Sequence, residues 1–124
     1  MSTLISNVNS PIQNIIVVDS DVNATAQNNI SAAAGSVYQI EVDNPTNDIL
    51  YLKLYDSVSV TVGTTAPVFI MPVPAKTTVN GFASASFTTG MAFATGISYC
   101  CTQETGTAGT SNPDSATTLR MVIS

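Results

Sequence analysis

Few side chains in this sequence could do chemistry, and those few are scattered. The chain has no histidine, which removes the commonest general base and the serine or cysteine arrangements that depend on it. Neither Lys53, on a patterned segment, nor Lys76, in a proline-flanked turn, is expected to act as a base instead. Glu41 and Asp43 could form a carboxylate pair for glycoside hydrolysis, but their spacing is far more typical of a solvated strand face next to Lys53. We therefore expect no catalytic residue and no enzyme activity.

A short acidic run imitates the opening of a calcium-binding loop. Asp19-Ser20-Asp21-Val22-Asn23 begins with the oxygen ligands that such a loop needs. The match then fails, because Ala24 replaces the glycine of the sharp turn and Ile30 replaces the glutamate that binds through both oxygens. An EF-hand is excluded. A looser cation site at Asp19 and Asp21 remains as an alternative to a plain turn, and we expect neither a metal nor a cofactor.

The two cysteines, Cys100 and Cys101, are adjacent in the sequence. Neighbours on a strand point to opposite faces, so an ordinary disulfide between them is geometrically poor. We expect two reduced structural thiols, with a strained vicinal bridge as the alternative. Two cysteines without a histidine cannot complete a zinc site within one subunit. Reduced thiols also indicate synthesis in the cell interior.

Length and charge limit the classes of protein that the chain can belong to. Its 124 residues suit one domain that can bury a core without disulfides or metals. Only 9 % of the residues are charged, and the net charge of −5 argues against nucleic-acid binding. No apolar run is long enough to span a bilayer, and residues 1–10 lack the pattern of a secretory signal, so we expect no membrane partner.

The clearest structural signal is the strict alternation of residues 49–55, which predicts a strand half-buried against a core. One face carries Leu50, Leu52 and Leu54, and the other carries Ile49, Tyr51, Lys53 and Tyr55. Residues 36–43 alternate in the same way. A hairpin between the two segments would place Val42, Ile40 and Tyr38 opposite the three leucines, with Lys53 diagonal to Glu41. Two facing sheets of a sandwich would show the same alternation.

Turn and breaker residues divide the remaining chain into further short strands. Prolines flank residues 68–73, which should therefore lie at a sheet edge. Gly81, within a small-residue strand, indicates a bulge or the close approach of another backbone. The final strand, residues 117–124, should dock inside a sheet. The polar loop of residues 103–116 is expected to be the most exposed segment.

About eight short strands with regularly spaced turns predict an all-β protein, most plausibly an antiparallel, jelly-roll-like β-sandwich, with a small barrel as second choice. A short helix within residues 24–34 is an alternative that its asparagines and threonines disfavour. Residues 1–11 are expected to form a loose N-terminal arm that a neighbour could order, and residues 12–124 a single sandwich domain.

Tyr51 and Tyr55 lie two residues apart and flank Lys53. They could form an aromatic platform for a sugar or a protein. More often such residues cover a sheet face or fill a subunit contact. Both alternatives place the two rings on the outer face of their strand.

Four pieces of the chain are found together in one group of known proteins. They are residues 44–56 (NPTNDILYLKLYD), 62–67 (VGTTAP), 73–75 (VPA) and 93–97 (FATGI). With these pieces the chain resembles small virion-associated structural proteins of tailed bacteriophages, including cyanophages. It departs from them at Lys76, where a glycine often follows the VPA piece, and at its adjacent cysteines.

The resemblance implies a virion structural protein, and we expect a capsid decoration or cement protein assembled in the host cytoplasm. The expected partners are the major capsid protein and further copies of the chain, in a homotrimer. The alternative is a tail- or fibre-associated protein that binds host-surface glycan through Tyr51, Tyr55 and residues 103–116, and a small lectin-like host protein ranks last. The residues expected to contact a partner are Leu4, Ile5, Val8, Pro11, Tyr51, Tyr55, Val62, Pro67, Phe69, Met71 and Pro72.

Overall fold

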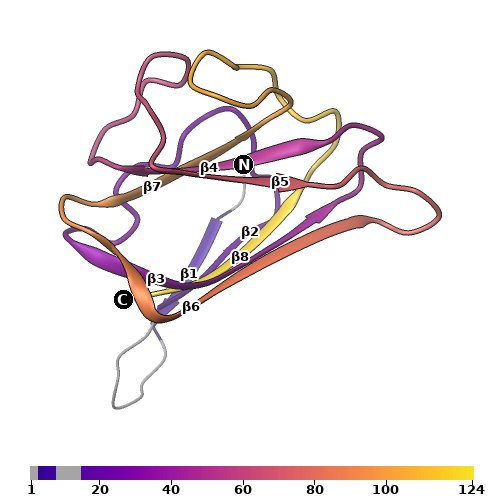
Figure 1. The fold of residues 1–124 in the computed structure, drawn as a ribbon. Helices are drawn as coiled ribbons and strands as arrows, with labels where there is room; N and C mark the ends of the chain where they lie inside the picture. The colour runs from indigo at the N-terminus through magenta and orange to yellow at the C-terminus, as the bar shows by residue number, and fades with distance from the viewer. Residues whose placement is uncertain (1–2, 8–14) are drawn as a thin grey trace.

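Two antiparallel sheets pack face to face as a β-sandwich (Figure 1). The computed structural model describes the backbone of residues 3–7 and all of residues 15–124. One sheet has the strand order β1-β2-β8-β3-β6 and the other has the order β5-β4-β7. The strands are β1 (Thr3–Asn7), β2 (Ile15–Asp19), β3 (Gly35–Asn44), β4 (Leu50–Asp56), β5 (Phe69–Val73), β6 (Gly81–Phe93), β7 (Ile97–Thr102) and β8 (Thr118–Ile123).

The strand order is that of a jelly roll in which one strand is reduced. A jelly roll pairs its first, eighth, third and sixth strands in one sheet and its second, seventh, fourth and fifth in the other. The order β2-β8-β3-β6 follows the first pattern, with β1 added at its edge, and β7-β4-β5 follows the second. The place of the reduced strand is taken by a segment beside β7, where Gln27 and Tyr99 exchange two backbone hydrogen bonds of 2.9 and 3.1 Å. The predicted jelly-roll-like sandwich is confirmed.

The core lies between the sheets, where alternate residues of the strands point inward. Each fully buried aliphatic side chain stabilises the fold by about 1.5–3 kcal/mol relative to an exposed one. The three leucines of β4 are fully buried there, as their alternation predicted. Their partners in the core include Val17, Val37, Ile40, Val42, Phe93, Ile97, Tyr99, Cys101, Leu119, Met121 and Ile123.

The predicted hairpin between residues 36–43 and 49–55 is wrong. β3 pairs with β6 and β8, whereas β4 pairs with β5 and β7 in the other sheet. Val42 and Leu50 share the core because they face each other across the sandwich rather than along one sheet. The structure instead contains two facing sheets, which was the alternative explanation of the alternation.

The chain crosses between the sheets at the turn that follows Asn44, whose buried side chain holds the turn together. Its Nδ2 donates hydrogen bonds to the carbonyl oxygens of Asp48 (2.8 Å) and Pro74 (3.0 Å). Its Oδ1 accepts from the backbone N and from Oγ1 of Thr46 (2.8 and 2.7 Å). Pro74 follows β5, so one amide joins the β3–β4 crossing to the β5–β6 crossing. A second bond between the crossings runs from Lys76 N to Thr46 O (2.8 Å).

A β-bulge in β3 changes which of its side chains face the core. The register with both neighbouring strands shifts between Val37 and Gln39. Because an extra residue inverts the alternation, Val37 is fully buried in the core together with Ile40. Tyr38, predicted to share a face with Ile40, lies instead against Gly90, whose φ of +84° only glycine adopts readily.

Three predicted placements are confirmed. β5 is an edge strand, and β8 lies inside the larger sheet between β2 and β3. Gly81 marks a close backbone approach, because a Cβ at this position would overlap the carbonyl oxygen of Pro74.

Two predictions concern segments outside the sandwich core. Residues 24–34 form no helix, and Asn29 and Ala32 within them have positive φ angles of 51° and 64°. Within the expected arm, residues 3–7 form β1 and pair with β2, while the rest of residues 1–11 lies outside the described residues. The described part of the chain has no helix that could cross a membrane.

Gly81→Ala should destabilise the fold, because the added Cβ would overlap the carbonyl oxygen of Pro74. We expect a loss of about 1–3 kcal/mol in the free energy of unfolding, because the carbonyl of Pro74 cannot move without disturbing the crossing. Urea unfolding followed by circular dichroism measures it. Ser84→Ala, an exposed change on the same strand, is the control and should change stability by less than about 0.5 kcal/mol. Equal midpoints for the two variants would contradict the assigned role of Gly81.

Candidate functional site

Lys53 was predicted to lie on a solvated face beside Glu41, and that prediction is wrong. Its side chain is fully buried, and it lies in a different sheet from Glu41. The nearest acceptor shown for its Nζ is the carbonyl oxygen of Gly109, at 3.4 Å. Gly109 belongs to the 103–116 loop, which folds over the outer side of the three-stranded sheet (Figure 1). The lysine therefore anchors a loop instead of facing solvent.

Tyr55 and Cys100 form a buried polar pair on the same side of that sheet. The Tyr55 hydroxyl lies 3.3 Å from the Cys100 Sγ, and both residues are fully buried. Burial raises the pKa of the tyrosine hydroxyl, and the hydrogen bond with Cys100 raises it further. Burial also raises the pKa of the Cys100 thiol, so both groups stay protonated at neutral pH. They are not placed to act as a nucleophile and its base.

The two cysteines are free and lie on opposite faces of β7, as predicted. Cys101 is part of the core between the sheets, whereas Cys100 contacts Tyr55 on the outer side. Burial raises the pKa of the Cys101 thiol to about 12. Such a thiol is a poor nucleophile, because only the thiolate reacts readily.

The loop of residues 103–116 was predicted to be the most exposed segment, and none of its residues is buried. Its own hydrogen bonds fold it into a compact cover. Gln103 Nε2 donates to the carbonyl oxygen of Asn112 (2.7 Å), and Ser111 N donates to Glu104 Oε1 (3.0 Å). The Ser111 contact lowers the pKa of Glu104. Asn112 Oδ1 also accepts from Ala24 N (3.0 Å), which ties the loop to the segment beside β7. Nine of its fourteen residues are exposed, in agreement with the predicted exposure, while its inner side contacts the buried Lys53 of β4.

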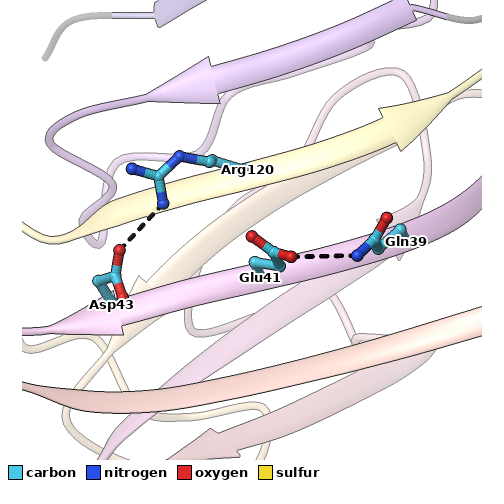
Figure 2. A network of polar contacts seen from close by, with 4 residues as sticks. All are labelled: Gln39, Glu41, Asp43 and Arg120. Carbon is cyan, nitrogen blue, oxygen red and sulfur yellow. Dashed lines mark hydrogen bonds and ion pairs between the residues drawn. The ribbon is translucent and has the colours of Figure 1, made fainter.

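The acidic residues of β3 lie on the outer face of the larger sheet and are separately engaged (Figure 2). Asp43 Oδ2 is 2.9 Å from Arg120 Nη1, an exposed ion pair, and Glu41 Oε2 accepts from Gln39 Nε2 at 3.1 Å. An open groove of about 180 Å³ beside them is lined by Ile16, Gln39, Glu41, Arg120, Met121 and Val122. No two carboxylates converge in this groove, so the arrangement does not suit hydrolysis of a glycosidic bond.

Asp19 performs a structural role that accounts for the acidic run around it. It is fully buried, its Oδ1 accepts from Asp21 N (3.0 Å) and its Oδ2 accepts from the Tyr99 hydroxyl (2.8 Å). One carboxylate oxygen is thus used within the turn, and the other accepts a hydrogen bond from β7. Among residues 3–7 and 15–124, no three cysteine or acidic side chains gather as a metal site would require.

The residues predicted to contact a partner fall into three groups. Leu4 and Ile5 lie on β1, described only by its backbone, and Val8 and Pro11 lie outside the described residues. Tyr55 and Met71 are buried, so their prediction as surface contacts is wrong, and Phe69 packs edge to face against Phe87 with ring centroids 5.7 Å apart. Those that retain exposed surface are Tyr51, Val62, Pro67, Phe69 and Pro72.

Most of these last residues belong to one stretch of the chain without charge. Residues 57–75 contain no charged side chain; they form the loop after β4, the edge strand β5 and its exit, and we name them the uncharged surface. Val68 is 58 % exposed and Val58 is 49 % exposed, although neither was predicted as a contact. The signal for both was present in the sequence as the length of the uncharged stretch. Asp56 ends it, and hydrogen bonds from Thr95 N and Ala94 N lower its pKa.

Lys53→Met should leave global stability almost unchanged and loosen the 103–116 loop. Methionine fills a similar volume without a buried charge, so we expect a change within about 1 kcal/mol. Limited proteolysis should cut the loop faster, because the bond to Gly109 is lost. Lys53→Ala is the comparison and should cost about 2–4 kcal/mol through its cavity. Equal, large losses in both variants would show that the ammonium group itself stabilises the fold.

Stability should fall at alkaline pH because of Cys101. Its thiol keeps its proton in the folded state up to about pH 12, whereas the unfolded chain releases it near its ordinary pKa. The contribution of this thiol to the free energy of unfolding is therefore fully present below about pH 8.5. Above that pH it falls by about 1.4 kcal/mol per pH unit. Urea midpoints measured across this range should decline less steeply for Cys101→Val than for the wild type. Met121→Leu, a core change without a titratable group, should keep the wild-type slope, and identical slopes in all three proteins would refute the assignment.

Comparisons with protein-family models, with curated proteins and with solved structures found no match. What the protein does is therefore inferred from its own residues, their arrangement and the motif resemblance described above.

Proposed function

We propose that the protein is a virion structural protein, a capsid decoration or cement protein that binds the phage head and bridges neighbouring major capsid subunits. The observation that favours this role most is the uncharged surface. Residues 57–75 present exposed apolar side chains along an edge strand and its flanking loop, with no charged group among them. Binding through such a surface costs little desolvation and gains about 25 cal/mol for each Å² of apolar area that is buried.

Repetition supplies the strength that a single small contact lacks. A capsid presents the same surface many times, and a protein that spans two subunits gains from the effective concentration of its second contact. Two of the phage-like motif pieces, residues 62–67 and 73–75, lie within the uncharged surface. The homotrimer expected from the sequence stays a prediction. In this role, Lys53 holds the covering loop in place.

The alternative, a glycan-binding tail or fibre protein, has less support. Its platform required Tyr51 and Tyr55 on one exposed face, but Tyr55 is fully buried. The 103–116 loop, its other expected contact, is exposed, but the ring of Tyr55 that should accompany it is not. No exposed pair of aromatic rings with the required spacing remains on β4.

A single charge in the uncharged surface should weaken head binding. Val68→Glu should lower the affinity for phage heads stripped of this chain by at least about tenfold, because the carboxylate must be desolvated on docking. Sedimentation of heads with bound protein, quantified per major capsid subunit, measures it.

Val79→Glu is the matched control. Val79 is 70 % exposed and follows β5, whereas Val68 precedes it, so the same substitution falls outside the proposed contact. It should leave occupancy unchanged. Wild-type protein that fails to bind heads would overturn the proposed function, and equal binding by all three proteins would exclude the uncharged surface as the contact.

A further inference from the structure

The outer edge of β6 is a second place on the surface where a partner can bind. β6 ends the order of the larger sheet, and within the described residues only β3 pairs with it. It is also the longest strand, with 13 residues. An edge of this kind presents backbone N–H and C=O groups that another strand can pair with.

Nothing in the sequence of β6 protects that edge. Monomeric proteins block edge strands with charged residues, prolines or a covering segment. β5, the edge strand on the same open side of the sandwich, contains Pro72, and β7 is covered by the segment around Gln27. Residues 81–93 contain neither a charged residue nor a proline.

The regular part of this edge is short and well defined. From Gly81 to Ser86 the register with β3 is unbroken, whereas the bulge of β3 and the positive φ of Gly90 disturb the stretch that follows. Phe82, Ser84 and Ser86 point outward and are exposed, and two of these three side chains are small. A second backbone can approach such a strand closely, and the half-exposed ring of Phe82 offers apolar area beside it.

The distribution of charge indicates which strand can pair with the β6 edge. The whole chain carries a net charge of −5, so most contacts between copies bring like charges together. Across a two-fold axis an antiparallel edge meets its own sequence, and residues 81–86 can do so without any charge facing its copy.

We propose that residues 81–86 pair antiparallel with the same residues of a second copy, so that two larger sheets join into one continuous sheet. The interface is small, which places the dimer in the weak class that forms at high local concentration. This contact does not depend on the proposed capsid role. If the chain also forms a trimer through other surfaces, the β6 edges join trimers in pairs.

Sedimentation of the full chain from about 5 to about 500 μM should show a dimer, or an even multiple, that strengthens with concentration. Ser84→Lys should weaken it at least about tenfold, because two ammonium groups then approach each other. Gln39→Lys, which adds the same charge to the same sheet face on a strand paired on both sides, should leave it unchanged. A monomer throughout, or a trimer indifferent to Ser84→Lys, overturns the proposal.

Cross-linking provides a test independent of affinity. Single cysteines introduced at positions 82–86 should give disulfide-linked dimers on oxidation, most efficiently at the residue that lies opposite itself, while the native thiols stay buried. Cysteine at position 39 is the control and should not cross-link. If no edge position cross-links more than this control, the β6 edges of two copies do not pair. A dimer that is still seen by sedimentation would then form through another part of the surface.

Discussion

The position at which the chain passes from one sheet to the other constrains the rest of the structure. Two crossings, β3 to β4 and β5 to β6, lie side by side, and the buried amide of Asn44 bonds to both of them. The missing side chain of Gly81 lets the second crossing approach closely enough. A buried amide with all its groups bonded is costly to disrupt, because any partner that moves leaves an unsatisfied polar atom. β4 is thereby placed opposite β3, and the alternate leucines of one sheet face the valine and isoleucine of the other.

The parts of this arrangement that could be predicted are those with a signal in neighbouring residues of the sequence. Alternation shows which side of a strand faces a core, and it placed the β4 leucines correctly. It does not show which strand is the neighbour, since facing strands and paired strands produce the same pattern, and the hairpin was therefore predicted wrongly. The bulge near Tyr38 also escaped prediction, because its cause is a register shift against two distant strands. Pro72 and Gly81 were predictable because the constraint lies within the residue itself.

The candidate site also separates into features with a local sequence signal and features that depend on distant segments. Lys53 and Tyr55 were placed on an exposed face because their own strand alternates. Both are buried, and Lys53 bonds to a loop some fifty positions along the chain that folds over it. Local patterns contain no information about such a cover, and the hydrogen bonds that shape it join side chains to backbone within the loop itself. The uncharged surface, in contrast, is a property of composition, and the sequence shows it directly once the strand edge is known.

The adjacent cysteines make the two layers of this protein chemically distinguishable. Cys100 lies on the outer side of the three-stranded sheet beside Tyr55, and Cys101 lies between the sheets, although one peptide bond joins them. A thiol reagent reaches the first when the outer side of that sheet opens locally and the second only when the sandwich separates. The chain therefore contains its own pair of reporters, one for local opening and one for complete unfolding. On an assembled particle, their relative labelling rates would show which of these motions binding suppresses.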